Sequence, residues 1–142
     1  MSRATGVRAL VVGALVAACA VGLWRSGTVG PRAPKLADGR AVRVEVLNGT
    51  KVPRAGLAVA EKLRERGFDV VDIRTADDTK QKNVVYDRTI VLDRVGEPRW
   101  ANAVAQCLGV QEPVRQRNDA LLLEVTVILG RDLAERYGGK KR

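Results

Sequence analysis

The stretch that decides the fold is Val42-Arg-Val-Glu-Val-Leu-Asn-Gly-Thr50, in which apolar residues alternate with charged ones before a turn signal. Such alternation predicts a strand with one buried and one solvated face. Asn48-Gly49 is expected to make a tight turn, because glycine adopts positive φ at little steric cost. The segment therefore predicts the first strand of a folded domain, followed by a helix that opens near Leu57, after Pro53 and Gly56.

The next segments continue the pattern of a strand-helix-strand unit. Leu57 to Arg66 places apolar residues at helical spacing and charged residues outward, which predicts an amphipathic helix. Gly67 is a typical helix stop, and the apolar residues of 68–74 predict a second strand. Two strands joined through a helix are expected to be parallel and to form a right-handed crossover.

The second half of the domain repeats this alternation less regularly. The expected elements are a short strand at 84–86, a strand at 89–93, a helix from Gly96-Glu97-Pro98 to Gly109, and a strand at 124–129. Trp100 falls on the apolar stripe of that helix and is interpreted as a core residue rather than a carbohydrate platform. The predicted fold class is α/β: a small mixed sheet with two helices in a two-layer sandwich, preceded by one transmembrane helix.

Three blocks of the sequence together resemble the LytR C-terminal domain family, which is found in bacterial cell-envelope proteins. They are 42–50, Thr89-Ile-Val-Leu-Asp-Arg-Val-Gly-Glu-Pro98 and Glu124-Val-Thr-Val-Ile-Leu-Gly-Arg-Asp132, and the resemblance covers roughly 42–133. In that family the domain usually follows a larger catalytic domain that transfers glycopolymers to the cell wall. The resemblance here covers only the accessory part and implies a stand-alone, membrane-anchored member with its domain outside the cytoplasm.

An uncharged run precedes the domain. Ala9 to Trp24 lies between Arg8 and Arg25, and as a helix it would reach about 24 Å, slightly short of a bilayer core of about 30 Å. Snorkelling arginines and an interfacial tryptophan make up the difference. We therefore expect a short basic N-terminus at 1–8, a single membrane anchor at 9–24 and a flexible, Gly- and Pro-containing linker at 25–41.

Two other interpretations of this segment also place the domain outside the cytoplasm. A cleaved secretory signal is one, although Leu23-Trp24-Arg25 offers no small-residue cleavage site. The other is a lipoprotein, because Val16-Ala17-Ala18-Cys19 resembles a lipobox whose cysteine, Cys19, is lipidated. Because arginines lie on both sides of the run, the positive-inside rule does not decide its orientation in the membrane. The localisation predicted from the resemblance is a single-pass cell-membrane protein.

The net charge of +9 is concentrated at the two ends of the chain. Residues 42–133 hold 15 basic and 14 acidic residues, whereas 1–41 hold six and one, and the predicted basic tail at 134–142 holds four and one. This balance speaks against a nucleic-acid-binding face built by the fold. Basic tails suit anionic membranes or wall polymers, so the expected partners are the membrane and peptidoglycan, an anionic wall polymer or an envelope protein. The alternative is a cytoplasm-facing regulator or nucleic-acid binder that acts through these tails.

The domain lacks two residue types on which catalysis often depends, histidine and serine. The chain has no histidine, and no serine follows Ser26, which removes an imidazole base and a serine nucleophile. The adjacent carboxylates Asp77 and Asp78 lie in a polar stretch that reads as a solvated loop. Cys107 is expected to be a free, at least half-buried thiol. We therefore predict no enzyme activity, no metal and no cofactor.

One segment has the placement of a ligand-binding turn. The residues Asn48, Gly49, Thr50, Lys51 and Arg54 follow a strand and precede a helix N-terminus, where α/β sheets tend to bind anions. Lys51 and Arg54 would make the contacts, and the competing interpretation is a turn with no ligand. Three Asp-Arg or Arg-Asp dipeptides at strand ends are interpreted as exposed ion pairs: Asp87-Arg88, Asp93-Arg94 and Arg131-Asp132.

Overall fold

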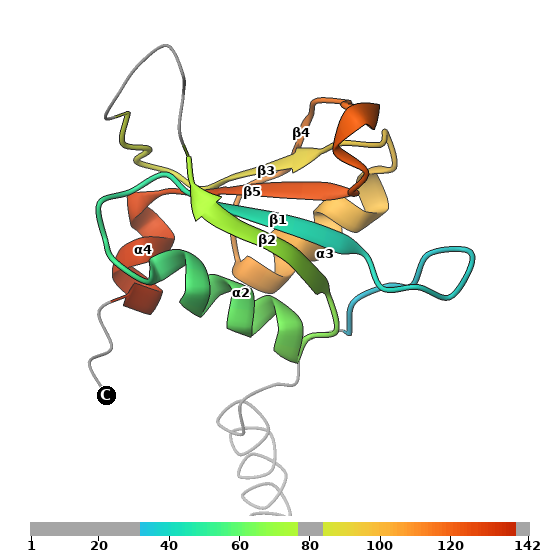
Figure 1. Cartoon of the computed structure of the whole chain (residues 1–142), viewed down its shortest axis with the longest axis horizontal. Coiled ribbons are helices and arrows are strands. Elements are labelled where there is room, and N and C mark those ends of the chain that lie inside the picture. Colours follow the sequence, from blue (N-terminus) through green and yellow to red (C-terminus); the bar gives the residue numbers. More distant parts are fainter. Residues whose placement is uncertain (1–31, 77–83, 139–142) are drawn as a thin grey trace, which may run out of the picture. The chain divides into compact units, whose positions relative to one another are not determined.

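The structure is a computed structural model that describes residues 32–76 and 84–138. Within them the chain forms one five-stranded sheet and three α-helices (Figure 1). The elements are β1 (Arg43–Asn48), α2 (Ala55–Glu65), β2 (Asp69–Thr75), β3 (Ile90–Asp93), α3 (Pro98–Leu108), β4 (Val114–Arg115), the 3-10 helix η1 (Asp119–Leu121), β5 (Val125–Leu129) and α4 (Arg131–Gly138). The α/β class expected from the sequence is confirmed.

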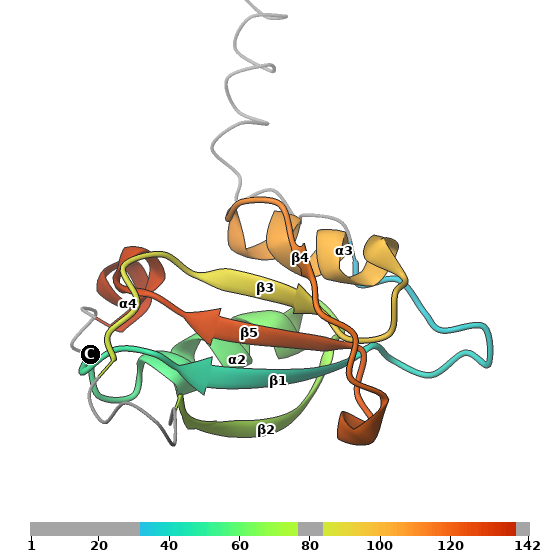
Figure 2. The ribbon, with the colours of Figure 1, turned by 90° about the horizontal axis from the view of Figure 1, so that it is seen from above.

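The sheet is mixed, and its strand order is β2-β1-β5-β3-β4 (Figure 2). β1 runs parallel to both β2 and β5, so the first strand-helix-strand unit has the expected parallel pair. β3 is antiparallel to β5 and parallel to the two-residue strand β4. The carboxyl ends of β1, β2 and β5 therefore meet at one edge of the sheet, together with the start of β3. We call it the carboxyl edge.

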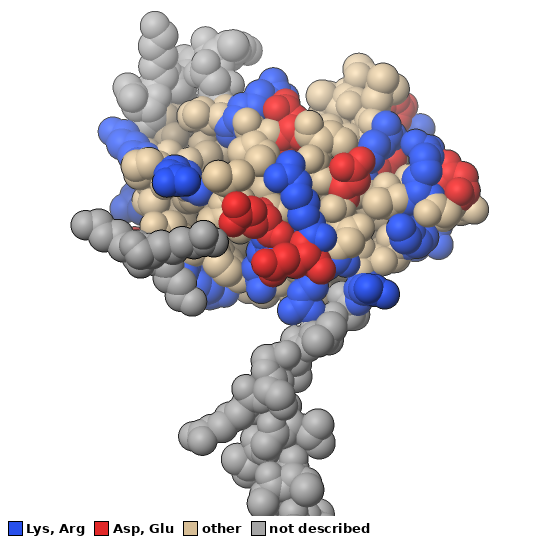
Figure 3. Space-filling model, turned by 60° about the horizontal axis from the view of Figure 1, so that its bottom comes forward, with Lys and Arg blue, Asp and Glu red and all other residues tan. Residues whose placement is uncertain are grey.

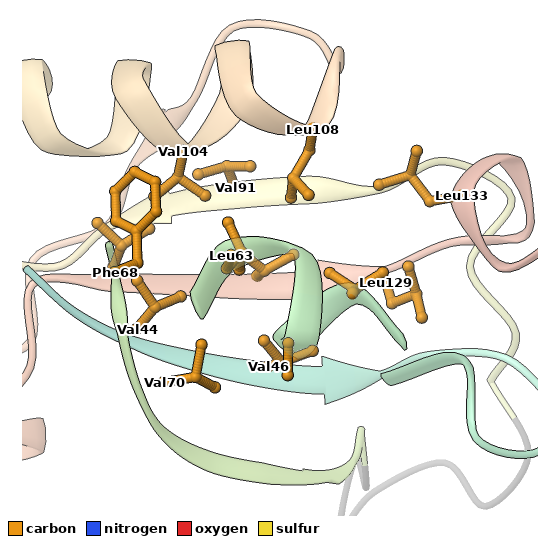
Figure 4. Packing of buried hydrophobic residues seen from close by; sticks show 14 of the residues in the cluster. Val44, Val46, Leu63, Phe68, Val70, Val91, Val104, Leu108, Leu129 and Leu133 are labelled. Carbon is orange, nitrogen blue, oxygen red and sulfur yellow. The ribbon is translucent and has the colours of Figure 1, made fainter. Parts of the chain in front are cut away.

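The apolar core lies between the sheet and its helices, which Figure 1 shows on one face. Alternate positions of neighbouring strands point to this face, as the register of Val46 with Val127 and of Val127 with Val91 shows. Each fully buried side chain of this size contributes about 1.5–3 kcal/mol. Figure 4 labels ten contributors to the core: Val44, Val46, Leu63, Phe68, Val70, Val91, Val104, Leu108, Leu129 and Leu133.

The opposite face of the sheet carries a buried polar network. Glu45 is 2% exposed and Thr126 is fully buried. Thr126 Oγ1 donates to Glu45 Oε2 at 3.1 Å and accepts from Arg94 Nε at 2.9 Å, and Arg74 forms an ion pair with Glu45. The alternation of β1 therefore marks two faces, as predicted, but its second face is closed over by long side chains instead of being fully solvated.

α4 is the main element that the sequence pattern did not predict. The expected basic tail at 134–142 starts inside this helix, whose residues Leu133 and Ala134 are buried in the core. The helix has only eight residues, too few to establish a helical period among its charged neighbours. The prediction of two helices is therefore wrong for the described part of the chain, which has three α-helices.

Smaller differences concern short or polar segments. Residues 84–86 are not a strand, β4 and η1 were not expected, and α2 begins at Ala55 instead of near Leu57. β4 has only two residues, both exposed, and η1 has only three, none of them buried, so neither carries a hydrophobic pattern. Gly67 and Gly109 follow their helices with φ of +95° and +66°, as expected of C-terminal glycines.

The described part of the linker expected at 25–41, residues 32–41, packs on the domain. Ala33 N donates to Arg66 O at 2.8 Å, Lys35 and Ala41 form an isolated antiparallel bridge, and Leu36 packs against the core. The predicted anchor Ala9 to Trp24 and the loop at 77–83 lie outside the described residues. Among the described helices, none is both long enough and apolar enough to span a bilayer.

Candidate functional site

The predicted binding turn at the carboxyl edge uses its own polar side chains to hold its shape. Asn48 Oδ1 accepts from Thr50 N at 3.0 Å and from Thr50 Oγ1 at 2.8 Å. Asn48 Nδ2 donates to Val52 O at 3.0 Å, and Thr50 Oγ1 accepts from Val52 N at 3.2 Å. Asn48 and Thr50 are thus engaged in the structure of the turn.

Gly49 is required for a reason other than the one expected. Its φ is not positive; a Cβ on this residue would lie 2.5 Å from Tyr86 Cδ2 and 2.7 Å from Leu129 O. Gly49 N donates to Leu129 O at 2.9 Å, and Tyr86 N donates to Gly49 O at 2.8 Å. The glycine allows three chain segments to approach closely, and the prediction of a positive φ is wrong.

Lys51 and Arg54 are the two predicted contacts that remain available to a ligand. Both are exposed, and neither forms a side-chain hydrogen bond or ion pair within the described residues. Arg54 precedes α2 with a φ of +62°, and the first turn of α2 has no acidic residue. Two positive charges therefore stand near the positive end of the α2 dipole, an arrangement that attracts anions. Ligand binding by these residues stays a prediction.

A second set of contacts at this edge locks the start of β3 to the start of α4. Thr89 N and Thr89 Oγ1 donate to Asp132 Oδ1 at 2.9 and 2.7 Å, and Gly130 N donates to Thr89 Oγ1 at 3.0 Å. Arg131 N donates to Tyr86 O at 2.9 Å. A Cβ on Gly130 would lie 2.3 Å from the carbonyl carbon of Arg88. These contacts hold the two segments in a fixed relation.

The charged dipeptides at strand ends have different roles. Arg131 and Asp87 form an exposed ion pair at 2.8 Å, as expected of residues at the rim. Asp93 instead shapes the turn before α3, because its Oδ1 accepts from the backbone N–H groups of three following residues: Val95, Gly96 and Glu97. Arg94 belongs to the buried network around Thr126. The expected exposed ion pair is found only between Asp87 and Arg131, which belong to two different dipeptides.

A shallow, open pocket of about 430 Å³ lies beside this lock. Its lining comes from the start of β3, the end of α3 and the start of α4, namely Arg88, Thr89, Gly109, Val110, Gln111 and Asp132. In the sequence, Arg88 and Asp132 stand out only as members of charged dipeptides, and the other four residues were not predicted to form a site. No short motif joins residues of such different chain positions, so the pocket becomes visible only in the folded chain.

The other side chains considered as functional candidates, Cys107 and Trp100, pack within the fold. Cys107 is a half-buried free thiol, and burial raises the pKa of that thiol, with Lys62 and Arg66 opposing only part of the effect. Trp100 packs against the core, with Arg99 Cζ 4.8 Å from the centroid of its ring. Within residues 32–76 and 84–138, no group of three or more His, Cys, Asp or Glu residues is placed to hold a metal ion.

The surface of the domain mixes the two signs of charge. Figure 3 shows acidic and basic side chains interspersed on the face that it presents, without a broad patch of one sign. This matches the near balance of 15 basic and 14 acidic residues in 42–133. This face therefore has no continuous basic surface that could bind the phosphate backbone of a nucleic acid.

A family model described as LytR cell envelope-related transcriptional attenuator matches residues 41–133. The matched range agrees with the predicted domain at 42–133 to within one residue at its start, and it contains all three blocks on which the resemblance was based. No curated protein and no solved structure matches the chain. The resemblance seen in the sequence is therefore confirmed.

Proposed function

We propose that this chain, which belongs to the LytR cell envelope-related transcriptional attenuator family, acts as a membrane-anchored, non-catalytic binding module of the bacterial cell envelope. The observation that carries the proposal is the family match over 41–133, which assigns the folded domain to an envelope-related family. The proposed ligands are wall glycan, an anionic wall polymer or a partner envelope protein. Lys51 and Arg54 are the proposed contacts for an anionic ligand.

The anchor is proposed from the uncharged run Ala9 to Trp24, with lipidation at Cys19 as the competing form of attachment. A reporter enzyme that is active only outside the cytoplasm, fused after Arg142, should be active in growing cells. A reporter that is active only inside the cytoplasm should be silent at the same position. Activity of the cytoplasmic reporter alone would reverse the proposed topology.

A non-catalytic role is supported by the chemistry of the carboxyl edge. The hydroxyl and amide groups of Thr50, Thr89 and Asn48 are occupied in holding turns together, and the chain offers no histidine as a base. In an assay of glycopolymer transfer to wall, the purified chain should give only the background rate. Turnover that disappears on replacing Asp77 or Asp78 would refute the non-catalytic role.

The basic ends of the chain favour one second candidate, a cytoplasm-facing regulator or nucleic-acid binder. Residues 1–41 hold six basic and one acidic residue, and 134–142 hold four and one. Binding through these ends would weaken steeply as salt is raised, because it depends on release of counterions from phosphate. Salt-dependent retention of the full chain on duplex DNA, together with a cytoplasmic C-terminus, would favour this candidate over the envelope module.

A further inference from the structure

The pocket beside the β3–α4 lock contains polar groups that the fold does not use. Asp132 Oδ1 accepts three hydrogen bonds, two from Thr89 and one from Leu133 N at 2.8 Å, but its Oδ2 has no hydrogen-bond partner within the described residues. The side chains of Arg88 and Gln111 also form no hydrogen bond or ion pair there. The pocket therefore offers a carboxylate acceptor, a guanidinium donor and an amide that both donates and accepts, all of which need partners from solvent or a ligand.

Arg88 and Asp132 line the same pocket without pairing with each other. Their charged atoms are more than 4.0 Å apart, whereas Arg131 next to Asp132 reaches Asp87 at 2.8 Å. The guanidinium and the carboxylate therefore do not neutralise each other through an ion pair, and both are available to a ligand in the pocket. The half-buried side chain of Val110 supplies an apolar contact in the same lining.

We propose that this pocket binds a sugar unit of an uncharged glycan. The proposal rests on the proposed envelope function and narrows the ligand of that function to one class. A sugar hydroxyl both donates and accepts, so neighbouring hydroxyls or an acetamido group satisfy Asp132, Arg88 and Gln111 together. The phosphate groups of an anionic wall polymer accept but do not donate, and they would bring negative charge against Asp132 Oδ2. The mixed lining thus selects wall glycan over anionic wall polymer.

The pocket is also prepared for its ligand by the rigidity of its walls. The hydrogen bonds among Thr89, Gly130 and Asp132 fix the relative positions of β3 and α4. The remaining wall of the pocket is the end of α3, where Gly109 has a φ of +66°. A volume of about 430 Å³ falls in the range of small-ligand sites, roughly 300–1,000 Å³. A preformed site loses little conformational freedom when the ligand binds.

The test is sedimentation of the full chain, purified in mild detergent, with insoluble peptidoglycan stripped of its phosphate polymers. Arg88→Gln and Gln111→Ala should each weaken binding about tenfold, the effect of losing one hydrogen bond with charged or closely held partners. The matched controls Arg115→Gln and Gln106→Ala change exposed residues outside the pocket and should bind like the unchanged chain. Thermal unfolding should be the same for all four variants.

Three results would overturn the inference. Pocket variants that sediment as well as the controls would exclude the pocket while leaving wall binding by the chain intact. Binding of soluble poly(glycerol phosphate) that Arg88→Gln weakens while the control Arg115→Gln leaves it unchanged would show that the pocket takes an anionic polymer. Failure of the unchanged chain to sediment with stripped wall would refute glycan binding by the chain as a whole, and with it this site.

Discussion

At the scale of single residues, Gly49 and Gly130 are needed for the space that they leave open. Neither has a positive φ, yet a Cβ on either would come within 2.5 Å of a neighbouring segment. The sequence indicates a turn at Asn48-Gly49, but the close contacts come from Tyr86 and Arg88, far along the chain. The local pattern therefore predicts the turn, but not the close contacts that require a glycine there.

Replacing Gly130 with alanine should lower the free energy of unfolding by about 3 kcal/mol, because the new Cβ would have to displace the backbone of Arg88. Gly39→Ala is the matched control: its φ is +83° but nothing lies within 4 Å of the added Cβ. Its cost should be about 1–2 kcal/mol, from backbone conformation alone. Urea unfolding of both variants measures the difference, and equal costs would contradict the close approach at Gly130.

Cys107 gives a second prediction at this scale. Burial raises the pKa of its thiol, so less of the reactive thiolate is present at neutral pH in the folded chain than in the unfolded chain. In a Cys19→Ser background, iodoacetamide should label Cys107 more slowly in buffer than in urea. The pH profile of labelling should also shift to higher pH. Equal rates and profiles in the two conditions would show that the thiol is freely exposed.

At the scale of elements, a helix or strand could be predicted where its segment was long enough to show a regular hydrophobic pattern. β1, α2, α3 and β5 each carry a clear strand or helix pattern over five or more residues, and all four form. α4 has eight residues and is stabilised by packing: Tyr137 lies against the core, and Lys62 Nζ is 5.6 Å from its ring centroid. Isolated helices this short are unstable in water, so tertiary contact decides their formation.

Removing the end of α4 should therefore destabilise the domain. A fragment of residues 32–133 loses the buried Ala134 and the packing of Tyr137, which should lower its free energy of unfolding by about 2 kcal/mol or more relative to 32–138. Thermal unfolding followed by circular dichroism measures the difference. If the two fragments melt at the same temperature, α4 is not part of the cooperative fold. The domain then ends at residue 133, as predicted from the sequence.

At the scale of the whole molecule, the family match relates the domain to the cell envelope, whereas the candidate binding pocket is visible only in the folded chain. The near neutrality of 42–133 and the basic ends could be counted from the sequence. Of the predicted site, Lys51 and Arg54 are exposed as expected, but Asn48 and Thr50 serve the turn. The pocket was missed because three separate segments supply its lining.

The central claim is that the folded domain, rather than its basic ends, recognises the cell wall. Sedimentation with purified cell wall tests it most directly, with residues 32–138 compared against residues 26–142, both of which retain the whole of α4. We expect both fragments to sediment with the wall, and the shorter one to do so even when salt is raised enough to screen exposed charges. Sedimentation of the longer fragment alone, or of neither at low salt, would contradict it.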